Sequence, residues 1–270
     1  MPAFDTTLTL VGGPTVLIEI GGFRLLTDPT FDPPGAYPRG GVTLEKTSGP
    51  ALPPEAIGPL DTVLLSHDQH ADNLDDAGRA LLGTVARTFT TVVGAGRLGG
   101  SATGLSPFET VVIEGGDGRR LFVTATPARH GPPGIEPITG EVIGFLLGIE
   151  APGDAVYVSG DTVWYEGVAA IARRFSPRLL ILNVGSAQAR GAFHVTMDAN
   201  DALEAAAAFP AATVVGVHTD GWAHFKEDGD ALAAAFRALG LADRYVQLAP
   251  GAATALRFGD DAVEAVRKDA

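Results

Sequence analysis

The chain has 270 residues, enough for one large α/β domain or two small ones, and its composition, 46% apolar and 19% charged, is typical of a globular protein. With 32 acidic against 19 basic residues the net charge is -13, so we expect neither nucleic acid nor a membrane as a partner. The absence of cysteine excludes disulfides and leaves only nitrogen and oxygen donors for any metal site.

The first part of the chain predicts a β-meander followed by a long loop. Short apolar or alternating runs at Thr6–Val11, Thr15–Ile20 and Phe23–Leu26 are separated by glycine pairs, as in consecutive antiparallel strands. The start, MPAFDTTLTL, has no basic or long apolar export segment, so we expect a cytoplasmic location. Residues 30–54 are rich in proline and glycine, which predicts a long loop able to cover a site.

The middle of the chain is expected to be mostly strands. A strand at Thr62–Leu65 leads into the turn SHDQHADNLD, a helix over about Leu74–Leu82 and a strand at Thr88–Val93. Residues 94–99 fit the GxGxxG pattern, but their glycine-rich surroundings predict no helix there and therefore no dinucleotide site. Further strands are expected at Glu109–Ile113, Leu121–Thr126, Val142–Ile149 and Ala155–Val158.

The last third alternates helices with strands. Helices are expected over about Val163–Phe175, Asp198–Phe209 and Asp230–Leu239. Strands are expected at Leu179–Asn183, Thr213–Val217, Tyr245–Leu248 and Thr254–Phe258. Two sheets packed face to face with helices outside would satisfy this order, and we expect one domain over residues 1–270.

All six histidines lie at or near the ends of predicted strands. His67 and His70 follow the strand at 62–65, His130 follows 121–126, His194 lies beyond 179–183, and His218 and His224 follow 213–217. Asp161, in the stretch SGDT, ends the strand at 155–158 in the same way. Strand ends converge on one rim of a layered α/β fold, where the connecting loops build sites.

This clustering favours a metal site. A single histidine beside a strand is more often hydrogen-bonded or exposed than a ligand, but several strand ends share the pattern here. Imidazole and carboxylate are donors for zinc, manganese or iron. A divalent cation also gives a physical reason to gather Asp68, Asp72 and Asp161, which would otherwise repel one another.

The sequence resembles the metallo-β-lactamase superfamily, in particular its branch of cytoplasmic metal-dependent hydrolases related to ascorbate-6-phosphate lactonase. The resemblance runs through nearly the whole chain, in the opening meander, the SHDQHADNLD turn, TPARHGP at 126–132, SGDT at 159–162 and VHTDGWAHF at 217–225. It implies an α/β fold, a single-domain four-layer αββα sandwich, with a metal site on one edge.

In that family a turn of the form HxHxDH supplies ligands to two ions. Carried onto this sequence, the resemblance implies that His67, His70 and His130 hold the first ion, Asp72 and His218 the second, and that Asp161 bridges the two. The sequence departs from the pattern twice. Asp68 and Gln69 separate the first two histidines instead of one residue, and Asn73 stands in place of the third histidine of the turn.

Each departure has a physical interpretation. A bulge can absorb an extra residue in a turn, so either His67 still reaches the metal or Asp68 replaces it. An amide oxygen is a poorer ligand than imidazole, so Asn73 would weaken the second position. We therefore expect a divalent metal, zinc or manganese, with one firmly bound ion and a second site that is weaker or vacant. An unbound Asn73 would hydrogen-bond a ligand or the attacking water.

The expected function is metal-dependent hydrolysis, in which an activated water attacks a small ester, lactone or phosphodiester. Asp72 or Asp161 would accept the proton of the water. The resemblance places Asp28 near the site, where it would orient a ligand histidine. Trp222 and His224 either line the substrate pocket or pack a loop over the rim.

Two other functions stay open at this stage. One is a degenerate relative that binds a metal or ligand without turnover, which the altered turn and Asn73 suggest. The other is phosphodiester cleavage on a lipid or nucleotide, although the net charge disfavours polynucleotides. We expect a small-molecule substrate, and the sequence leaves open both a monomer and a homo-oligomer. His194, just before the helix-capping candidates Thr196 and Asp198, is expected to have a local structural role.

Overall fold

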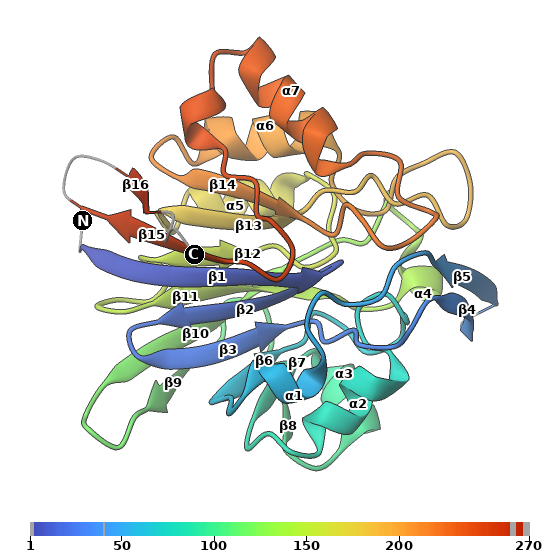
Figure 1. Cartoon of the computed structure of the whole chain (residues 1–270), viewed down its shortest axis with the longest axis horizontal. Helices are drawn as coiled ribbons and strands as arrows, with labels where there is room; N and C mark the ends of the chain where they lie inside the picture. Colours follow the sequence, from blue (N-terminus) through green and yellow to red (C-terminus); the bar gives the residue numbers. More distant parts are fainter. Residues whose placement is uncertain (1–2, 40, 260–262, 267–270) are drawn as a thin grey trace.

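The computed structural model describes residues 3–39, 41–259 and 263–266. Two β-sheets pack face to face, and helices cover the outer faces, which gives the four layers of an αββα sandwich (Figure 1). The expected α/β fold is therefore confirmed. Because the layers share one inner core, the loops that leave one edge of both sheets can meet at a common site.

The first sheet has eight strands, and its first three strands in the chain form the expected meander. In spatial order they are β16 (Val263–Val266), β15 (Ala253–Phe258), β1 (Phe4–Gly12), β2 (Thr15–Ile20), β3 (Phe23–Thr27), β6 (Thr62–Leu64), β7 (Thr88–Thr90) and β8 (Ala102–Gly104). Neighbours from β3 to β8 are parallel, and the other pairs are antiparallel.

The second sheet has six strands. In spatial order they are β14 (Thr213–Val217), β13 (Leu179–Asn183), β12 (Val156–Val158), β11 (Ile143–Gly148), β10 (Arg120–Pro127) and β9 (Thr110–Glu114). Strands β12, β13 and β14 are parallel, and β10 points the same way because β11 runs antiparallel to both β10 and β12. The carboxyl ends of β10, β12, β13 and β14 therefore leave the same edge of this sheet.

Strand β13 shows why the second sheet reads as continuous apolar runs. Leu179 and Ile181 belong to the core between the sheets, whereas Leu180 and Leu182 pack on the other face, in the cluster that contains the covering helices. Successive side chains of a strand point to opposite faces, so a strand with both faces covered is apolar at every position. All four side chains are fully buried.

The helices divide between the two outer faces (Figure 1). The second sheet is covered by α5 (Glu166–Ala172), α6 (Ala199–Ala208) and α7 (Gly229–Ala238), and the first by α1 (Pro54–Ile57), α2 (Asp76–Leu82) and α3 (Val92–Leu98). Short helical turns occur at α4 (Glu136–Thr139) and η1 (Ala242–Arg244). No helix in the described part of the chain is long and apolar enough to cross a membrane.

The segment 30–54, expected to be a loop, contains a β-hairpin of β4 (Gly35–Arg39) and β5 (Val42–Lys46). Strand β4 contains glycine and proline and is mostly exposed, so it has no apolar alternation, whereas Val42 and Leu44 of β5 alternate with polar residues over only a few positions. A buried ion pair fixes it: Nζ of Lys46 lies 3.1 Å from Oδ2 of Asp75, whose other oxygen caps α2. The hairpin projects at the edge where the strands end (Figure 1).

Two other expectations were wrong. The strand predicted at 88–93 stops at Thr90, and Thr91 caps α3 by accepting a hydrogen bond from the backbone of Gly94. A helix therefore does run through the GxGxxG segment. Residues 245–248 form no strand, only an isolated bridge between Tyr245 and Val214.

The turn after β13 leaves no room for a side chain at Gly185, where a Cβ atom would lie 2.1 Å from the carbonyl oxygen of His218. We predict that Gly185→Ala lowers the free energy of unfolding by about 1–3 kcal/mol, because overpacked backbone must shift. Gly116→Ala is the control, since nothing lies within 4 Å of its Cβ position. Urea denaturation of both variants is the measurement, and equal stabilities would contradict this packing.

Candidate metal centre

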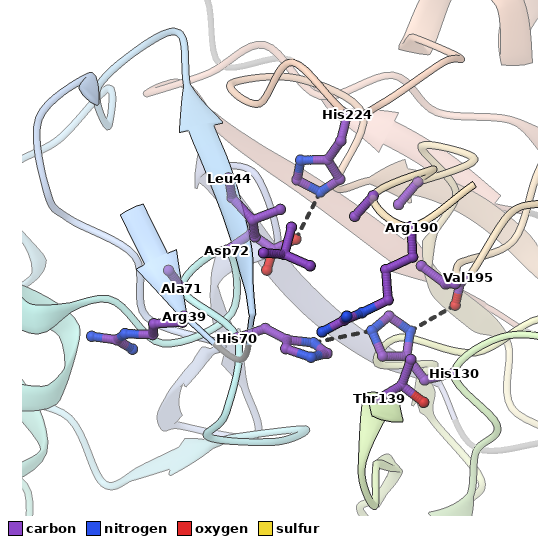
Figure 2. A pocket seen from close by; sticks show the side chains of 13 residues that line it. Arg39, Leu44, His70, Ala71, Asp72, His130, Thr139, Arg190, Val195 and His224 are labelled. Carbon is purple, nitrogen blue, oxygen red and sulfur yellow. Dashed lines mark hydrogen bonds and ion pairs between the residues drawn. The ribbon is translucent and has the colours of Figure 1, made fainter. Parts of the chain in front are cut away.

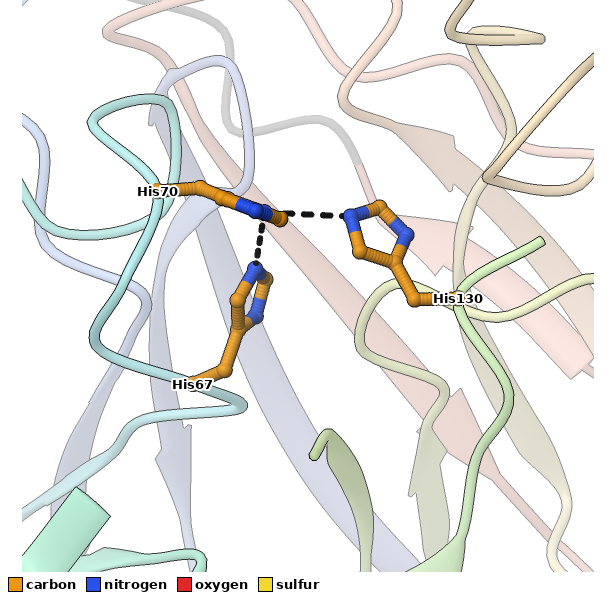
Figure 3. A group of neighbouring side chains, drawn as sticks. All are labelled: His67, His70 and His130. Carbon is orange, nitrogen blue, oxygen red and sulfur yellow. Dashed lines mark hydrogen bonds between the residues drawn. The ribbon is translucent and has the colours of Figure 1, made fainter. Parts of the chain in front are cut away.

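Three imidazoles meet where the turn after β6 faces the loop after β10. Nε2 of His67 lies 2.9 Å from Nδ1 of His70, and Nε2 of His130 lies 3.1 Å from the same atom (Figure 3). One ring nitrogen from each residue falls within a group spanning 4.8 Å. We call these three residues the histidine tripod.

The extra residue of the turn is absorbed on the side away from the tripod. The amide nitrogen of Gln69 donates to the backbone oxygens of Thr139 and Glu141, at 3.1 and 3.2 Å. The carboxylate of Asp68 is bound by the guanidinium of Arg97, with Nε 2.9 Å from Oδ2. Since Asp68 is held by a cation on α3, the alternative in which it replaces His67 in the tripod is not favoured.

Neighbouring groups determine which nitrogens of the tripod carry protons. Nδ1 of His130 lies 2.7 Å from the carbonyl oxygen of Val195, which can only accept, so Nδ1 is protonated and Nε2 carries a lone pair. Nδ1 of His67 lies 2.9 Å from Oγ of Ser66. With Asp28 ionised, that hydroxyl donates to Oδ2 of Asp28 at 2.9 Å and accepts from His67, so Nε2 of His67 also carries a lone pair.

Two lone pairs therefore face the same nitrogen of His70. Nδ1 of His70 can donate at most one hydrogen, so at least one of its contacts with His67 and His130 places two lone pairs together. Burial, and after it the charge of His130, lowers the pKa of His70 to about 4, and burial lowers the pKa of His67 well below its usual value. The rings of His67 and His70 are therefore neutral near pH 7, which suits binding of a cation.

Asp161 lies beside the tripod and links it to the end of β14. Its Oδ1 accepts hydrogen bonds from the side chain of Asn183 at 2.7 Å and from Nδ1 of His218 at 3.0 Å, and its Oδ2 lies 3.7 Å from Nε2 of His130. Burial would raise the pKa of Asp161, but the charge and hydrogen bond of His218 hold it well below the usual value. Asp161 is therefore a carboxylate at neutral pH.

Asp72 occupies the far side of the centre. Its Oδ2 lies 2.9 Å from Nε2 of His224 and 3.6 Å from Nε2 of His218. Burial would raise the pKa of Asp72, but the hydrogen bond from His224 and the charges of both histidines hold it well below the usual value. Burial lowers the pKa of His218, but the charges of Asp161 and Asp72 and the hydrogen bond to Asp161 raise it by more. The pKa of His218 is therefore above its usual value.

The donors of this centre fit a divalent cation. Oδ1 of Asp72, Oδ2 of Asp161 and Nε2 of His218 are buried and have no hydrogen-bond partner among the described residues. Unpaired buried polar atoms are costly, and buried carboxylates usually require a cation. Neutral imidazole and carboxylate are ligands for zinc and manganese, so the residues present match the metal that the sequence predicts.

The outer residues Asp28 and Asn73 lie behind the tripod. Asp28 accepts from the backbone and hydroxyl of Ser66, at 2.6 and 2.9 Å, and from the side-chain amide of Asn73 at 3.3 Å. Asn73 is fully buried, and its Oδ1 has no partner among the described residues. Asp28 thus acts on the tripod only through Ser66 and His67.

Backbone strain is concentrated at this edge. Asp28, Ser186 and His218 adopt φ values of 30°, 48° and 59°, a region that non-glycine residues rarely occupy. The backbone nitrogen of His218 is held by a 2.8 Å hydrogen bond to the carbonyl oxygen of Gly13, which ties the two sheets together. Such strain persists where surrounding structure fixes it, and it clusters at functional sites.

A pocket opens onto the centre (Figure 2). It is lined by Arg39, Val42, Leu44, His70, Ala71, Asp72, His130, Thr139, Ala187, Ala189, Arg190, Val195 and His224. The β4–β5 hairpin supplies one wall, so the segment expected to cover a site does so. Of the two aromatic candidates, only His224 lines this pocket. Trp222 packs under the hairpin, with Nζ of Lys46 5.4 Å from its ring centre.

His194 lies outside the metal centre, in keeping with the local structural role beside a helix cap that the sequence predicts for it. Its Nε2 is 3.4 Å from a carboxylate oxygen of Asp201, and its Nδ1 is 3.8 Å from one of Asp198, which caps α6. The sequence reasoning missed Asn183, which holds Asp161, and Arg190, which lines the pocket. Asn183 carried a usable signal, since it is a polar residue at the end of a buried strand, whereas Arg190 lies in a loop without a pattern.

Comparisons with known proteins agree with this geometry. Residues 23–219 match the family model described as the beta-lactamase superfamily domain. The chain is 24% identical over 230 residues to a UPF0173 protein of Bacillus subtilis, covering 81% of this chain and 87% of the other. It is 27% identical over 249 residues to a UPF0173 metal-dependent hydrolase of Myxococcus xanthus, covering 89% and 80%.

Solved structures share the fold. An isothiocyanate hydrolase from gut bacteria of Delia radicum superposes with a TM-score of 0.77 at 22% identity, covering 92% of this chain and 97% of the other. A protein of Veillonella parvula, described as a possible metal-dependent hydrolase, superposes with a TM-score of 0.80 at 20% identity, covering 92% and 98%.

Burial raises the pKa of Asp28 to about 7, although hydrogen bonds from Ser66 oppose the shift. In the unfolded chain this pKa is about 3.9, so between these values the folded protein holds a proton that the unfolded chain has released. We predict that the stability of the metal-free protein relative to Asp28→Asn falls as pH rises from about 4 to 7 and then levels off. Urea denaturation across this range is the measurement. Parallel stability profiles would contradict the shift.

Proposed function

Because this chain belongs to the metallo-β-lactamase superfamily and is a metal-dependent hydrolase of that fold, we propose that it hydrolyses small esters, lactones or phosphodiesters at the histidine tripod. The observation that carries the proposal is the conflict at His70, whose Nδ1 faces the lone pairs of His67 and His130. A cation bound by all three nitrogens would remove that conflict. We propose zinc or manganese, which both accept these donors.

The tripod and Asp161 would hold the first ion. When bound, a divalent cation lowers the pKa of a water ligand towards neutrality and polarises a carbonyl or phosphoryl oxygen. The chain's own residues support that chemistry. The hydrogen bonds from His67 to Ser66 and from His130 to Val195 fix the ring orientations and keep the lone pairs directed at one point.

Proton transfer is assigned to the buried carboxylates. Oδ1 of Asp72 and Oδ2 of Asp161 have no partner among the described residues, and both groups are ionised at neutral pH. Asp72 lines the pocket, so its carboxylate can accept the proton of a water that attacks a substrate bound there. Asp161 orients His218 through a 3.0 Å hydrogen bond at Nδ1.

The pocket supports a small and largely apolar substrate. The walls beside the tripod include Val42, Leu44, Ala187 and Val195, and apolar linings of this kind bind small molecules. Arg190 adds positive charge near His70, where an electronegative oxygen of the substrate would lie. We therefore place esters and lactones before phosphodiesters.

An isothiocyanate is a further candidate substrate to be assayed. The structurally similar Delia radicum gut-bacterial protein is an isothiocyanate hydrolase by its description. An isothiocyanate carries a small electrophilic carbon on an apolar group, which matches the apolar lining around Leu44. Water attack at that carbon uses the same activated nucleophile as attack at an ester carbonyl.

We predict that His130→Ala and Asp161→Ala each lower kcat/KM by at least about 100-fold, because loss of a ligand costs more than loss of its outer hydrogen-bond partner. His194→Ala is the control and should keep wild-type activity. Assays of zinc- and manganese-loaded protein on ester, lactone, isothiocyanate and phosphodiester substrates are the measurement. Bound metal without turnover on any of them would instead favour a degenerate, ligand-binding protein.

The hairpin wall gives a separate prediction. Leu44→Asp places a charge in the apolar wall and should raise KM for an apolar ester or isothiocyanate by about 10-fold, since burying a charge beside an apolar group is unfavourable. Leu239→Asp is the matched control, because Leu239 is 62% exposed, caps the carboxyl end of α7 and is not among the residues that line the pocket. An equal KM for both variants would exclude the hairpin from substrate binding.

A further inference from the structure

A second group of buried donors surrounds Asp72, next to the tripod. Nε2 of His224 and Nε2 of His218 approach the same oxygen of Asp72, at 2.9 and 3.6 Å. The exposed fractions of the side chains are 7% for Asp72, 9% for His224 and 0% for His218. They come from three segments: the turn after β6, the end of β14 and the loop that follows β14.

The tautomer of His218 leaves a lone pair aimed at this group. Its Nδ1 lies 3.0 Å from Oδ1 of Asp161, a carboxylate oxygen that can only accept, so Nδ1 carries a hydrogen. In the neutral ring the lone pair is therefore on Nε2, which has no partner among the described residues and lies 3.6 Å from Oδ2 of Asp72. A lone pair directed at a carboxylate is repulsive, so this contact requires a positive charge, either a second proton on the ring or a cation between the two groups.

The turn itself offers no imidazole on this side. The side-chain amide nitrogen of Asn73 donates to Asp28 at 3.3 Å, so this side chain is directed towards the carboxylate that contacts His67 through Ser66. His224 approaches from the opposite direction, on the loop 218–228 beyond β14. Figure 2 shows its ring directed at Asp72 across the pocket.

We propose that His224 is the third protein ligand of the second cation, which the family resemblance assigns to Asp72 and His218, and that it supplies the imidazole that the turn lacks at Asn73. This inference rests on the proposed function, since it concerns a position beside the tripod. Binding requires the hydrogen that Nε2 of His224 now donates to Asp72 to move to Nδ1 of the same ring, since neutral imidazole binds a cation through the nitrogen without a hydrogen. Nδ1 of His224 is buried and has no partner among the described residues. The second position is then occupied, where Asn73 alone would leave it weak.

The test is the number and affinity of bound ions. Wild type, His224→Ala, His130→Ala and His194→Ala are stripped with a chelator, titrated with zinc or manganese in a calorimeter, and then analysed for metal content. We expect two ions per chain in wild type and His194→Ala. We expect one in His224→Ala, with the affinity of the second event lowered at least about 10-fold. His224→Gln serves if the alanine variant does not fold.

The outcomes separate the two proposals. Two ions at unchanged affinity in folded His224→Ala or His224→Gln would overturn the role of His224. One ion in wild type that is lost in His130→Ala would overturn the second site and leave the tripod intact. Wild type without any bound ion would overturn the tripod and with it the proposed function. Manganese-loaded protein adds a readout independent of activity, since only a paired site gives a spin-coupled resonance signal.

Discussion

The structure depends on one electrostatic conflict, the meeting of three buried imidazoles whose neighbours dictate their protons. Val195 accepts a hydrogen from the outer nitrogen of His130, and with Asp28 ionised Ser66 accepts one from His67, so the inner nitrogens of both rings present lone pairs to His70. With Asp28 protonated, the lone pair of His130 and the hydrogen of His67 still cannot both be matched by one nitrogen of His70. A polypeptide does not stabilise this arrangement by itself, because no hydrogen can satisfy all three nitrogens. A bound divalent cation does, and the buried carboxylates nearby have the same requirement.

The sandwich brings these side chains together from distant parts of the chain. His70 follows a strand of the first sheet, whereas His130, Asp161 and His218 follow strands of the second, and the shared core holds the two edges in register. Positive φ at His218 and at Asp28 shows that the backbone is strained to reach this geometry. The packing of the two sheets offsets that strain and holds the metal centre on a fixed edge. One wall of the substrate pocket comes instead from the β4–β5 hairpin.

The sequence predicted the layers well because each layer has a simple period. Strand β13 is apolar from Leu179 to Leu182, and helices begin at capping residues such as Asp198. It also placed His67, His70 and His130 at strand ends, which converge in this fold. The hairpin at 35–46 escaped prediction because β4 contains glycine and proline and is mostly exposed. Its anchor, the ion pair of Lys46 with Asp75, is a contact between distant residues.

The finer roles of the site residues depended on contacts that no spacing reveals. The pairing of Asp68 with Arg97 and the approach of His224 to Asp72 join residues 29 and 152 positions apart. The most direct test of the central claim is an anomalous-difference map from crystals of the zinc-loaded protein. The account predicts a peak bonded to Nε2 of His67, Nδ1 of His70 and Nε2 of His130. A map without a peak there, with the three rings unchanged, would contradict it.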